Sequence, residues 1–113
     1  MDETISGKSP VGRRLSRIQK SEQRFLVHNG RRVKLVDEMT IGRDKSNTIT
    51  IDDPLVSRIH CIVRRIRSSW YVEDIGSTNG TWINGKQLIK GRAVRLNPDD
   101  IIKLGGRIEV TLA

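Results

Sequence analysis

From Phe25 onward, apolar residues occur in short runs separated by Gly, Asn, Asp, Pro and Ser. Several runs alternate apolar with polar residues, and runs of this kind, rich in Val and Ile, predict β-strands bounded by turns. Two of the interruptions are Asn-Gly pairs, Asn29-Gly30 and Asn84-Gly85, and Asn-Gly accepts the positive φ angles of a type I′ hairpin turn. No segment shows the period of a long amphipathic helix. The pattern therefore predicts an all-β fold, an antiparallel β-sandwich.

The expected strands follow one another closely along the chain. They are residues 25–28, 33–36, 39–41, 49–51, 59–66, 70–75, 81–83, 86–88, 93–96, 101–104 and 108–112. We expect the strands 59–66 and 70–75 to pair across the turn Arg67-Ser68-Ser69. Alternation in the last strand places Ile108, Val110 and Leu112 on the face toward the core.

Residues 1–24 have a different composition. They are polar, rich in Ser, Gly, Lys and Arg, and without a sustained period. Such a segment buries too little apolar surface to offset the entropy lost on ordering. We therefore expect a flexible basic arm of residues 1–24, followed by one domain of residues 25–113, which is within the ordinary size of a domain.

The chain is strongly basic, with a net charge of +8 and a pI near 10.4. Residues 1–24 hold six Lys or Arg against three Asp or Glu, and residues 25–113 hold fifteen against ten. Such an excess attracts phosphoproteins, nucleic acids and acidic lipids alike. Composition thus indicates an anionic partner without choosing one, although phosphate is common to all three.

A single cysteine, Cys61, excludes an intramolecular disulfide and leaves no thiol cluster for a metal. We expect it to be a small buried hydrophobe. The chain has no apolar run of membrane-spanning length and no signal peptide. We expect a soluble, intracellular monomer, cytoplasmic or, in a eukaryote, nuclear, with no cofactor and no metal.

Three loops, residues 42–47, 55–60 and 76–81, carry the candidate chemistry, since functional residues of a sandwich tend to lie in its loops. The Arg43 guanidinium can donate paired, charge-assisted hydrogen bonds to phosphate oxygens. The hydroxyls of Ser57 and Thr78 add neutral donors. Asn79 has an amide donor and an acceptor, which suit an extended peptide backbone. Together these residues predict a phosphate-binding and peptide-binding surface.

Two other classes of function compete with this one. Catalysis is disfavoured, because Ser57 and His60 have no third residue with a clear orienting role. Residues 76–81 also lack the lysine of a nucleotide-binding P-loop. A basic nucleic-acid-binding β domain is the main alternative. Steep salt dependence and indifference to the phosphorylation of a peptide would distinguish it.

The order of these residues resembles the forkhead-associated (FHA) domain family over residues 25–113. The blocks that carry the resemblance are Gly42-Arg43, Ser57-Arg58-Ile59-His60, Asp74 to Thr81 and Asn84-Gly85. The resemblance implies a sandwich of about eleven short strands that binds phosphothreonine in an extended segment of a partner. The implied partners are threonine-phosphorylated proteins downstream of a Ser/Thr kinase, and the implied role is that of a non-catalytic signalling adaptor.

The resemblance also implies a role for individual residues. Arg43 and Ser57 match the family's phosphate-binding positions, and Thr78 matches a second hydroxyl position near the phosphate. Asn79 matches the residue that holds the peptide main chain, and Arg58 a position that contacts phosphate or peptide. The positions with a structural role are Gly42, His60, Gly80, Asn84 and Gly85.

Selectivity at the third residue after phosphothreonine is the next expectation from the resemblance. Leu55 and Val56 stand where the family adjusts this choice, and both are apolar, which favours an apolar residue there. Lys45, Arg58 and Arg65 favour an acidic one instead. The sequence leaves both possibilities open.

Thr4 follows two acidic residues, Asp2 and Glu3, a context that acidophilic kinases accept. If Thr4 were phosphorylated, the arm is long enough to fold back onto the site of Arg43 and Ser57 and block other partners. An autoinhibited switch of this kind is a lesser alternative to a simple adaptor.

Overall fold

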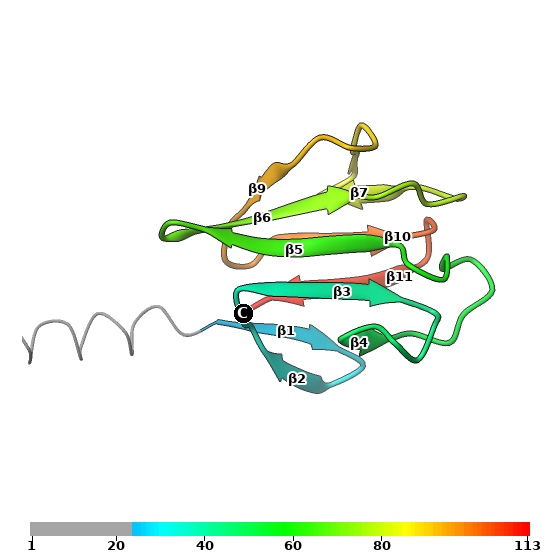
Figure 1. Cartoon of the computed structure of the whole chain (residues 1–113), viewed down its shortest axis with the longest axis horizontal. Coiled ribbons are helices and arrows are strands. Elements are labelled where there is room, and N and C mark those ends of the chain that lie inside the picture. Colours follow the sequence, from blue (N-terminus) through cyan, green and yellow to red (C-terminus); the bar gives the residue numbers. More distant parts are fainter. Residues whose placement is uncertain (1–23) are drawn as a thin grey trace, which may run out of the picture.

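The computed structural model describes residues 24–113, which form two β-sheets stacked face to face (Figure 1). The strands are β1 (Phe25–His28), β2 (Arg31–Lys34), β3 (Glu38–Gly42), β4 (Ile49–Thr50), β5 (Cys61–Ile66), β6 (Ser69–Asp74), β7 (Thr81–Ile83), β8 (Lys86–Gln87), β9 (Val94–Leu96), β10 (Ile101–Leu104) and β11 (Ile108–Leu112). The expected all-β sandwich of eleven strands is confirmed. No helix in this described part could cross a membrane. Thr4 and the rest of the expected arm up to residue 23 lie outside the described residues.

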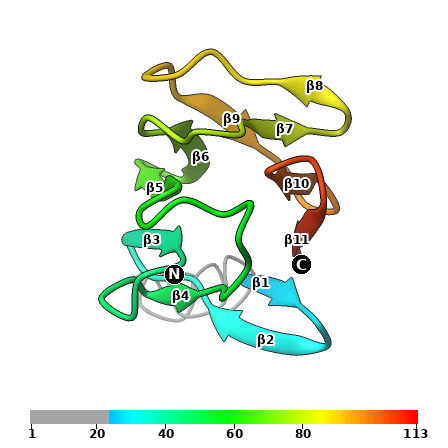
Figure 2. The ribbon, with the colours of Figure 1, turned by 90° about the vertical axis from the view of Figure 1, so that its right-hand side faces the viewer.

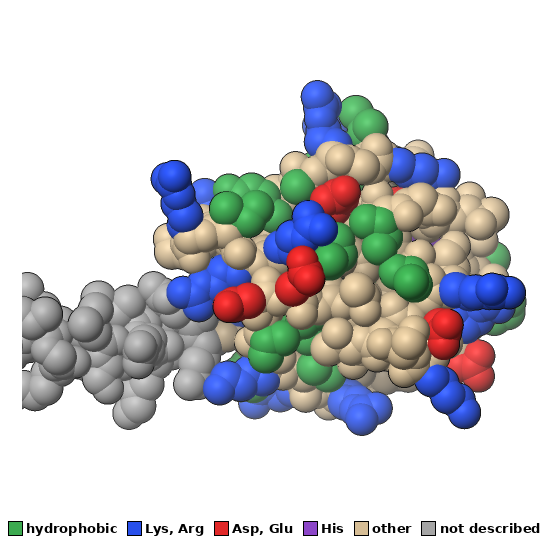
Figure 3. Space-filling view, in the orientation of Figure 1, with side chains coloured by type: hydrophobic (Ala, Val, Ile, Leu, Met, Phe, Trp, Pro, Cys, Tyr) green, Lys and Arg blue, Asp and Glu red, His purple; other side chains and the backbone are tan. Residues whose placement is uncertain are grey.

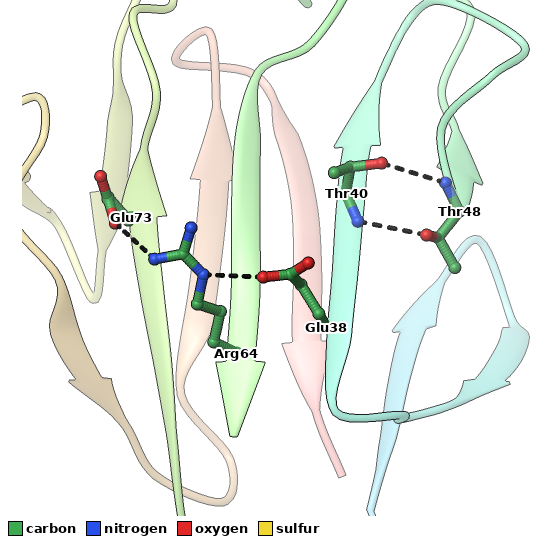
Figure 4. A network of polar contacts seen from close by, with 5 residues as sticks. All are labelled: Glu38, Thr40, Thr48, Arg64 and Glu73. Atoms are coloured by element: carbon green, nitrogen blue, oxygen red, sulfur yellow. Dashed lines mark hydrogen bonds and ion pairs between the residues drawn. The ribbon is translucent and has the colours of Figure 1, made fainter. Parts of the chain in front are cut away.

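One sheet has the strand order β2-β1-β11-β10-β7-β8, and the other has the order β4-β3-β5-β6-β9. Paired strands are antiparallel except β3 and β4, which are parallel. The sequence pattern does not predict this parallel pair. It forms because residues 43–48 fold back beside β3 before β4 begins. The backbone amides of Thr40 and Thr48 each donate to the other's hydroxyl, at 3.2 and 3.3 Å (Figure 4).

Apolar side chains from both sheets fill the space between them. The largest ones with less than 2% exposure are Leu26, Met39, Ile41, Val56, Val63, Val72, Ile102, Leu104, Val110 and Leu112. Alternation in β11 holds as predicted, because Val110 and Leu112 are buried and Ile108 packs against the core. Cys61 is fully buried, and this burial raises the pKa of its thiol. The cysteine is therefore a core residue, as expected.

The outer face of the five-stranded sheet is polar along its centre. Arg64 on β5 donates to Glu38 on β3 at 3.0 Å and to Glu73 on β6 at 3.2 Å (Figure 4). Acidic and basic side chains are interspersed over this face (Figure 3). Ion pairs with this much solvent exposure contribute little to stability. Their effect is to keep this face of the sheet hydrophilic.

Tight turns set the register of three hairpins, and they move some strand bounds from their expected places. In the β1–β2 turn Asn29 and Gly30 have φ angles of 54° and 75°, as a type I′ turn requires. This turn pairs His28 with Arg31, so β2 begins two residues before its expected start. The β5–β6 turn contains only Arg67 and Ser68, because Ile66 pairs with Ser69.

The strands end in loops at two opposite ends of the sandwich. Figure 2 faces the end with the β3–β4, β4–β5 and β6–β7 loops, formed by residues 43–48, 51–60 and 75–80. The β5–β6 turn lies at the other end, on the left in Figure 1. Ile59 and His60 belong to the β4–β5 loop and not to β5, which begins at Cys61. The three candidate loops therefore share one end.

Candidate functional site

A buried histidine joins two of these loops. His60 has 0% exposure. Its Nδ1 accepts from the backbone N–H of Ser57 at 3.0 Å, and its Nε2 lies 2.8 Å from the carbonyl of Gly80. These partners require a neutral ring that carries its proton on Nε2. Burial lowers the pKa of His60, and the bond to Gly80 and the charge of Asp74 offset only part of this effect.

Ser57 occupies the centre of the loop cluster. Its hydroxyl oxygen accepts from the backbone N–H of Thr78 at 3.0 Å, and its carbonyl accepts from the N–H of Arg43 at 2.9 Å. The hydroxyl proton of Ser57 can then be donated to an oxygen outside the protein. His60 bonds to the backbone of Ser57 and not to the hydroxyl, so the pair is not arranged as a nucleophile and a base.

Arg43 and Arg58 lie on adjacent loops. Both are exposed, and together with Asp44 they line a shallow hollow at the surface. Their backbones are held by a bond from Asp44 N to Arg58 O at 3.1 Å and by Asn47, whose Nδ2 donates to Arg58 O at 2.6 Å. Within residues 24–113, neither guanidinium forms an ion pair. Two exposed cations whose backbones are held by hydrogen bonds therefore lie in the loops next to Ser57.

Gly42 allows this close approach of the β3–β4 and β4–β5 loops. A Cβ at this position would lie 2.2 Å from the carbonyl oxygen of Arg58 and 2.8 Å from Nδ2 of Asn47. The nearest of these atoms is backbone and cannot move aside independently. A side chain at position 42 would therefore push these two loops apart.

Asp74 organises the third loop from beneath. Its carboxylate accepts from the N–H groups of Gly76 and Ser77 at 2.9 and 2.8 Å. It also accepts from the hydroxyls of Ser77 and Thr81 at 2.5 and 2.7 Å. Burial by itself raises the pKa of Asp74, but these bonds to the ionised form outweigh it, so the pKa is lowered overall. The loop is wrapped around a buried anion.

Thr78 and Asn79 are the exposed residues at the tip of this loop. The Nδ2 of Asn79 donates to the carbonyl of Leu55 at 3.2 Å, which ties the tip to the β4–β5 loop. Gly80 adopts a φ angle of 93°, and its N–H donates to the Ser77 hydroxyl at 3.0 Å. The backbone N–H of Thr78 bonds to the Ser57 hydroxyl, and the Asn79 amide bonds to the β4–β5 loop, so both residues lie beside the loop that carries Ser57.

The remaining predicted residues lie in different surroundings. Val56 is only 1% exposed and its side chain packs in the core, so its role in selectivity stays a prediction that this burial does not favour. Leu55 is half-buried and Lys45 is exposed. Asn84 and Gly85 form the β7–β8 turn, away from the loop cluster, where Asn84 bonds to Asp100 and Ile101 at 2.9 Å.

Three residues that shape the site do not stand out in the sequence. Asp74 and Ser77 are visible there only as parts of a motif, and Asn47 is one polar residue in a polar loop. Asn47 is buried and bonds to the carbonyls of Asp44 and Arg58. An acid followed by glycine, serine and threonine is a pattern for a side chain that accepts backbone N–H bonds, so Asp74 has a detectable signal. In the described part, no group of three or more His, Cys, Asp or Glu could hold a metal ion.

Taken together, the fold and the candidate site define a β-sandwich with a polar, cationic surface built from loops at one end. The family model "FHA domain" matches residues 39–105. The chain therefore belongs to the FHA domain family.

Three similar proteins illustrate this relationship. The FHA domain-containing protein FhaB of Mycobacterium tuberculosis is 34% identical over 77 residues, which are 67% of this chain and 48% of FhaB. Protein FraH of Nostoc sp. is 47% identical over 51 residues, 45% of this chain and 18% of FraH. A structure solved in a study of phosphothreonine-dependent FHA domain interactions is 28% identical, with a TM-score of 0.72, and the match covers 80% of this chain and 94% of that one. The chain thus spans less than half the length of these two curated relatives.

Proposed function

We propose that this chain is a phosphothreonine-dependent binding module that recognises an extended segment of a partner protein and performs no catalysis itself. The observation that carries the proposal is the convergence of Arg43, Ser57 and Thr78 from three loops at one end of the sandwich. Membership of the FHA family and the similarity to an FHA domain with phosphothreonine-dependent interactions support it.

The chemistry of the site suits a phosphate group. A phosphorylated threonine carries a charge of roughly −1.5 to −2 and three strong acceptor oxygens. Arg43 and Arg58 offer charge-assisted donors, and Ser57 and Thr78 offer hydroxyls. Each hydrogen bond to a charged group is worth on the order of 1.5–3 kcal/mol. Two or three such bonds separate a phosphorylated peptide from the unmodified one by several kcal/mol.

Asn79 gives the site a way to hold the peptide main chain. Its Nδ2 already donates to a backbone carbonyl, that of Leu55. An incoming strand offers the same kind of group, so Asn79 can exchange one carbonyl for another without leaving an amide unpaired. We propose that this exchange accompanies peptide binding. The partner is then a protein that a Ser/Thr kinase has phosphorylated on threonine. The module acts as an intracellular monomer.

The decisive experiment compares Arg43→Ala and Ser57→Ala with the unmodified chain in a calorimetric titration with a phosphothreonine peptide. Both variants should lose nearly all binding while their thermal unfolding remains cooperative. Arg67→Ala in the β5–β6 turn, at the opposite end of the sandwich, removes the same charge from an exposed residue and should bind normally. Titration curves that match the unmodified chain in both site variants would refute the assigned site.

Selectivity can be measured with an oriented phosphothreonine peptide library. With Val56 in the core, Leu55 is the apolar candidate, against the exposed cations Lys45 and Arg58. Because the cations outnumber the apolar side chain, we propose that an acidic residue is preferred three places after phosphothreonine. Enrichment of apolar residues there would contradict this preference but not the phosphate site.

A pull-down with the unmodified chain against Arg43→Ala, read by phosphoproteomics, would then name the partner.

A further inference from the structure

An open groove lies between β8 and β9, which are the outermost strands of the two sheets on the side of the sandwich away from β2 and β4. Figure 2 shows both strands at the top of the molecule, with β2 at the bottom. The groove has a volume of about 280 Å³. We call it the β8–β9 groove, and the lining residues that define it here are Ile83, Lys86, Leu88, Ile89, Arg92 and Val94.

The floor and one wall of the groove are apolar. Ile83 and Leu88 are 8% and 9% exposed, and Val94 is half-buried. Ile89 is 62% exposed, more than any other large apolar residue in the part of the chain that the structure describes. A single exposed isoleucine is ordinary on a protein surface. This one extends an apolar surface that already has a concave shape, with room for one or two side chains.

The rim of the groove is cationic. Lys86 and Arg92 line it, Lys90 lies between Ile89 and Arg92 in the β8–β9 loop, and all three cations are exposed. Within residues 24–113 none of them forms an ion pair, and no lining residue is acidic. Figure 3 shows Lys or Arg and hydrophobic side chains together at the top of the molecule, where the β8–β9 loop lies in Figure 1. Charge complementarity therefore favours an acidic partner.

The backbone of β8 suits an extended partner. The N–H of Leu88 donates to the carbonyl of Thr81 at 2.8 Å, toward β7. Hydrogen bonding alternates along an antiparallel pair, so Gln87 directs its N–H and carbonyl away from β7, to the open edge of the sheet. An edge of this kind can pair with an added strand.

The groove also adjoins the β6–β7 loop, which carries Thr78 and Asn79. The Leu88–Thr81 bond joins the β8–β9 loop to the residue after the β6–β7 loop. The N–H of Gly91 donates to the carbonyl of Asp74, the residue before that loop, at 2.8 Å. A partner held at Thr78 and Asn79 is therefore close to the groove.

We propose that the β8–β9 groove binds an unphosphorylated segment of the partner in which Asp or Glu residues flank a bulky apolar side chain. That this segment belongs to the same partner as the phosphothreonine rests on the proposed function. A second copy of this chain is disfavoured, because its net charge of +8 repels the rim. A bilayer takes up apolar residues that protrude, whereas Ile83 and Leu88 lie at the floor of a groove.

The test is a selection of random unphosphorylated peptides, displayed as a library, on the unmodified chain. Enriched peptides should combine Asp or Glu with Leu, Ile or Phe. In calorimetric titrations, their affinity should fall at least about tenfold in Ile89→Ser and in Arg92→Glu, as for loss of a central anchor. Because these peptides carry no phosphate, failure of the phosphothreonine site does not affect the result.

The matched controls lie at the opposite edge of the six-stranded sheet. Val36→Ser removes an apolar side chain that is 52% exposed, and Lys34→Glu reverses a charge on β2, so both should bind the enriched peptides normally. Absence of enrichment, or equal affinity in Ile89→Ser and the unmodified chain, would overturn the proposal. So would binding to phosphatidylserine vesicles that Ile89→Ser abolishes, since this would assign the surface to a membrane.

A fused peptide tests whether one partner can use both sites. A phosphothreonine peptide joined to an enriched sequence through a flexible linker should bind at least about tenfold more tightly than either part alone. Ile89→Ser should remove this gain but leave the binding of the phosphothreonine part unchanged. A fused peptide that shows no gain with any linker length would refute the shared partner, while the selection result would still assign the groove.

Discussion

Single buried polar residues hold the loops of this FHA domain in place. His60 has no exposed surface, yet both ring nitrogens are used, one by the Ser57 N–H and one by the Gly80 carbonyl. A protonated ring would lose its acceptor on Nδ1 and place a charge inside the sandwich. The proposed ligand surface therefore depends on a neutral, buried histidine that lies beneath it.

A pH dependence follows from His60. Its folded pKa is lowered from 6.5, so the unfolded chain takes up a proton first on acidification. The stabilisation is complete above pH 6.5 and is lost as the pH falls through the folded pKa. The free energy of unfolding, measured by denaturant titration, should drop between neutral pH and pH 5.

The control for this prediction is His60→Gln, which cannot take up a proton. The unfolding free energy of this variant should be lower at neutral pH, because one of the two hydrogen bonds of the ring is lost. It should change less between neutral pH and pH 5 than that of the unmodified chain. A variant with the pH dependence of the unmodified chain would mean that other groups cause the loss.

At the scale of an element, the β6–β7 loop is built around one carboxylate. Four donors converge on Asp74, two from the backbone and two from hydroxyls. Ser77 is buried, and its hydroxyl links Asp74 to the end of the loop, because it donates to the carboxylate and accepts from the Gly80 N–H. Thr78 and Asn79 can be exposed and still fixed because the loop beneath them is fully hydrogen-bonded.

We expect Asp74→Asn to destabilise the domain and to weaken phosphopeptide binding, although Asp74 touches no ligand. An amide has one acceptor oxygen in place of two and no charge, so removing the carboxylate should cost on the order of 3 kcal/mol.

The folded pKa of Asp74 is lowered from 3.8, so its stabilisation is present above that pH and is lost as the pH falls through the folded pKa. Denaturant titration would measure the loss of stability, and NMR shifts of Thr78 and Asn79 would measure the weaker phosphopeptide binding. The exposed turn variant Asp52→Asn should change neither, and an Asp74→Asn variant as stable as the unmodified chain would contradict the prediction.

At the scale of the whole molecule, the two sheets use their inner faces for packing, and the candidate ligand-binding residues lie in the loops at one end. Residues 25–113 have a positive excess, but the exposed guanidinium groups of Arg43 and Arg58 are concentrated beside Ser57. Under the proposed function, this domain recognises one or two charges at a defined place. A protein that binds nucleic acid through its general basicity contacts many phosphates instead.

Salt dependence separates these two modes of binding. Binding of a phosphopeptide should weaken by about tenfold or less between roughly 50 and 200 mM salt, whereas six to ten phosphate contacts with DNA would cost about 10³–10⁵. Fluorescence anisotropy with a labelled phosphopeptide and a labelled DNA duplex would measure both. Phosphatase treatment of the peptide should abolish its binding. Tight DNA binding with a steep salt slope, unaffected by Arg43→Ala, would favour the nucleic-acid alternative.

Local sequence rules were sufficient for most of the fold. Asn29-Gly30 and Asn84-Gly85 form two-residue turns because asparagine and glycine accept positive φ angles at low cost. Ile108, Val110 and Leu112 face the core because side chains alternate along a strand. The parallel β3–β4 pair was not predictable in this way, since it depends on a loop that folds back through bonds between Thr40 and Thr48.

The sequence by itself determined the strands, most turns and the residue types of the site, because these depend on neighbours along the chain. Its motifs also single out Arg43, Ser57, Thr78 and Asn79 as candidates for ligand contact. Only the tertiary structure decided that Val56 is buried and that His60 bonds to Ser57 and Gly80. It also decided that the Asp74 carboxylate accepts the hydrogen bonds that hold the β6–β7 loop. The physical reason is that burial and hydrogen-bond partners are set by segments distant in sequence, such as residues 60 and 80.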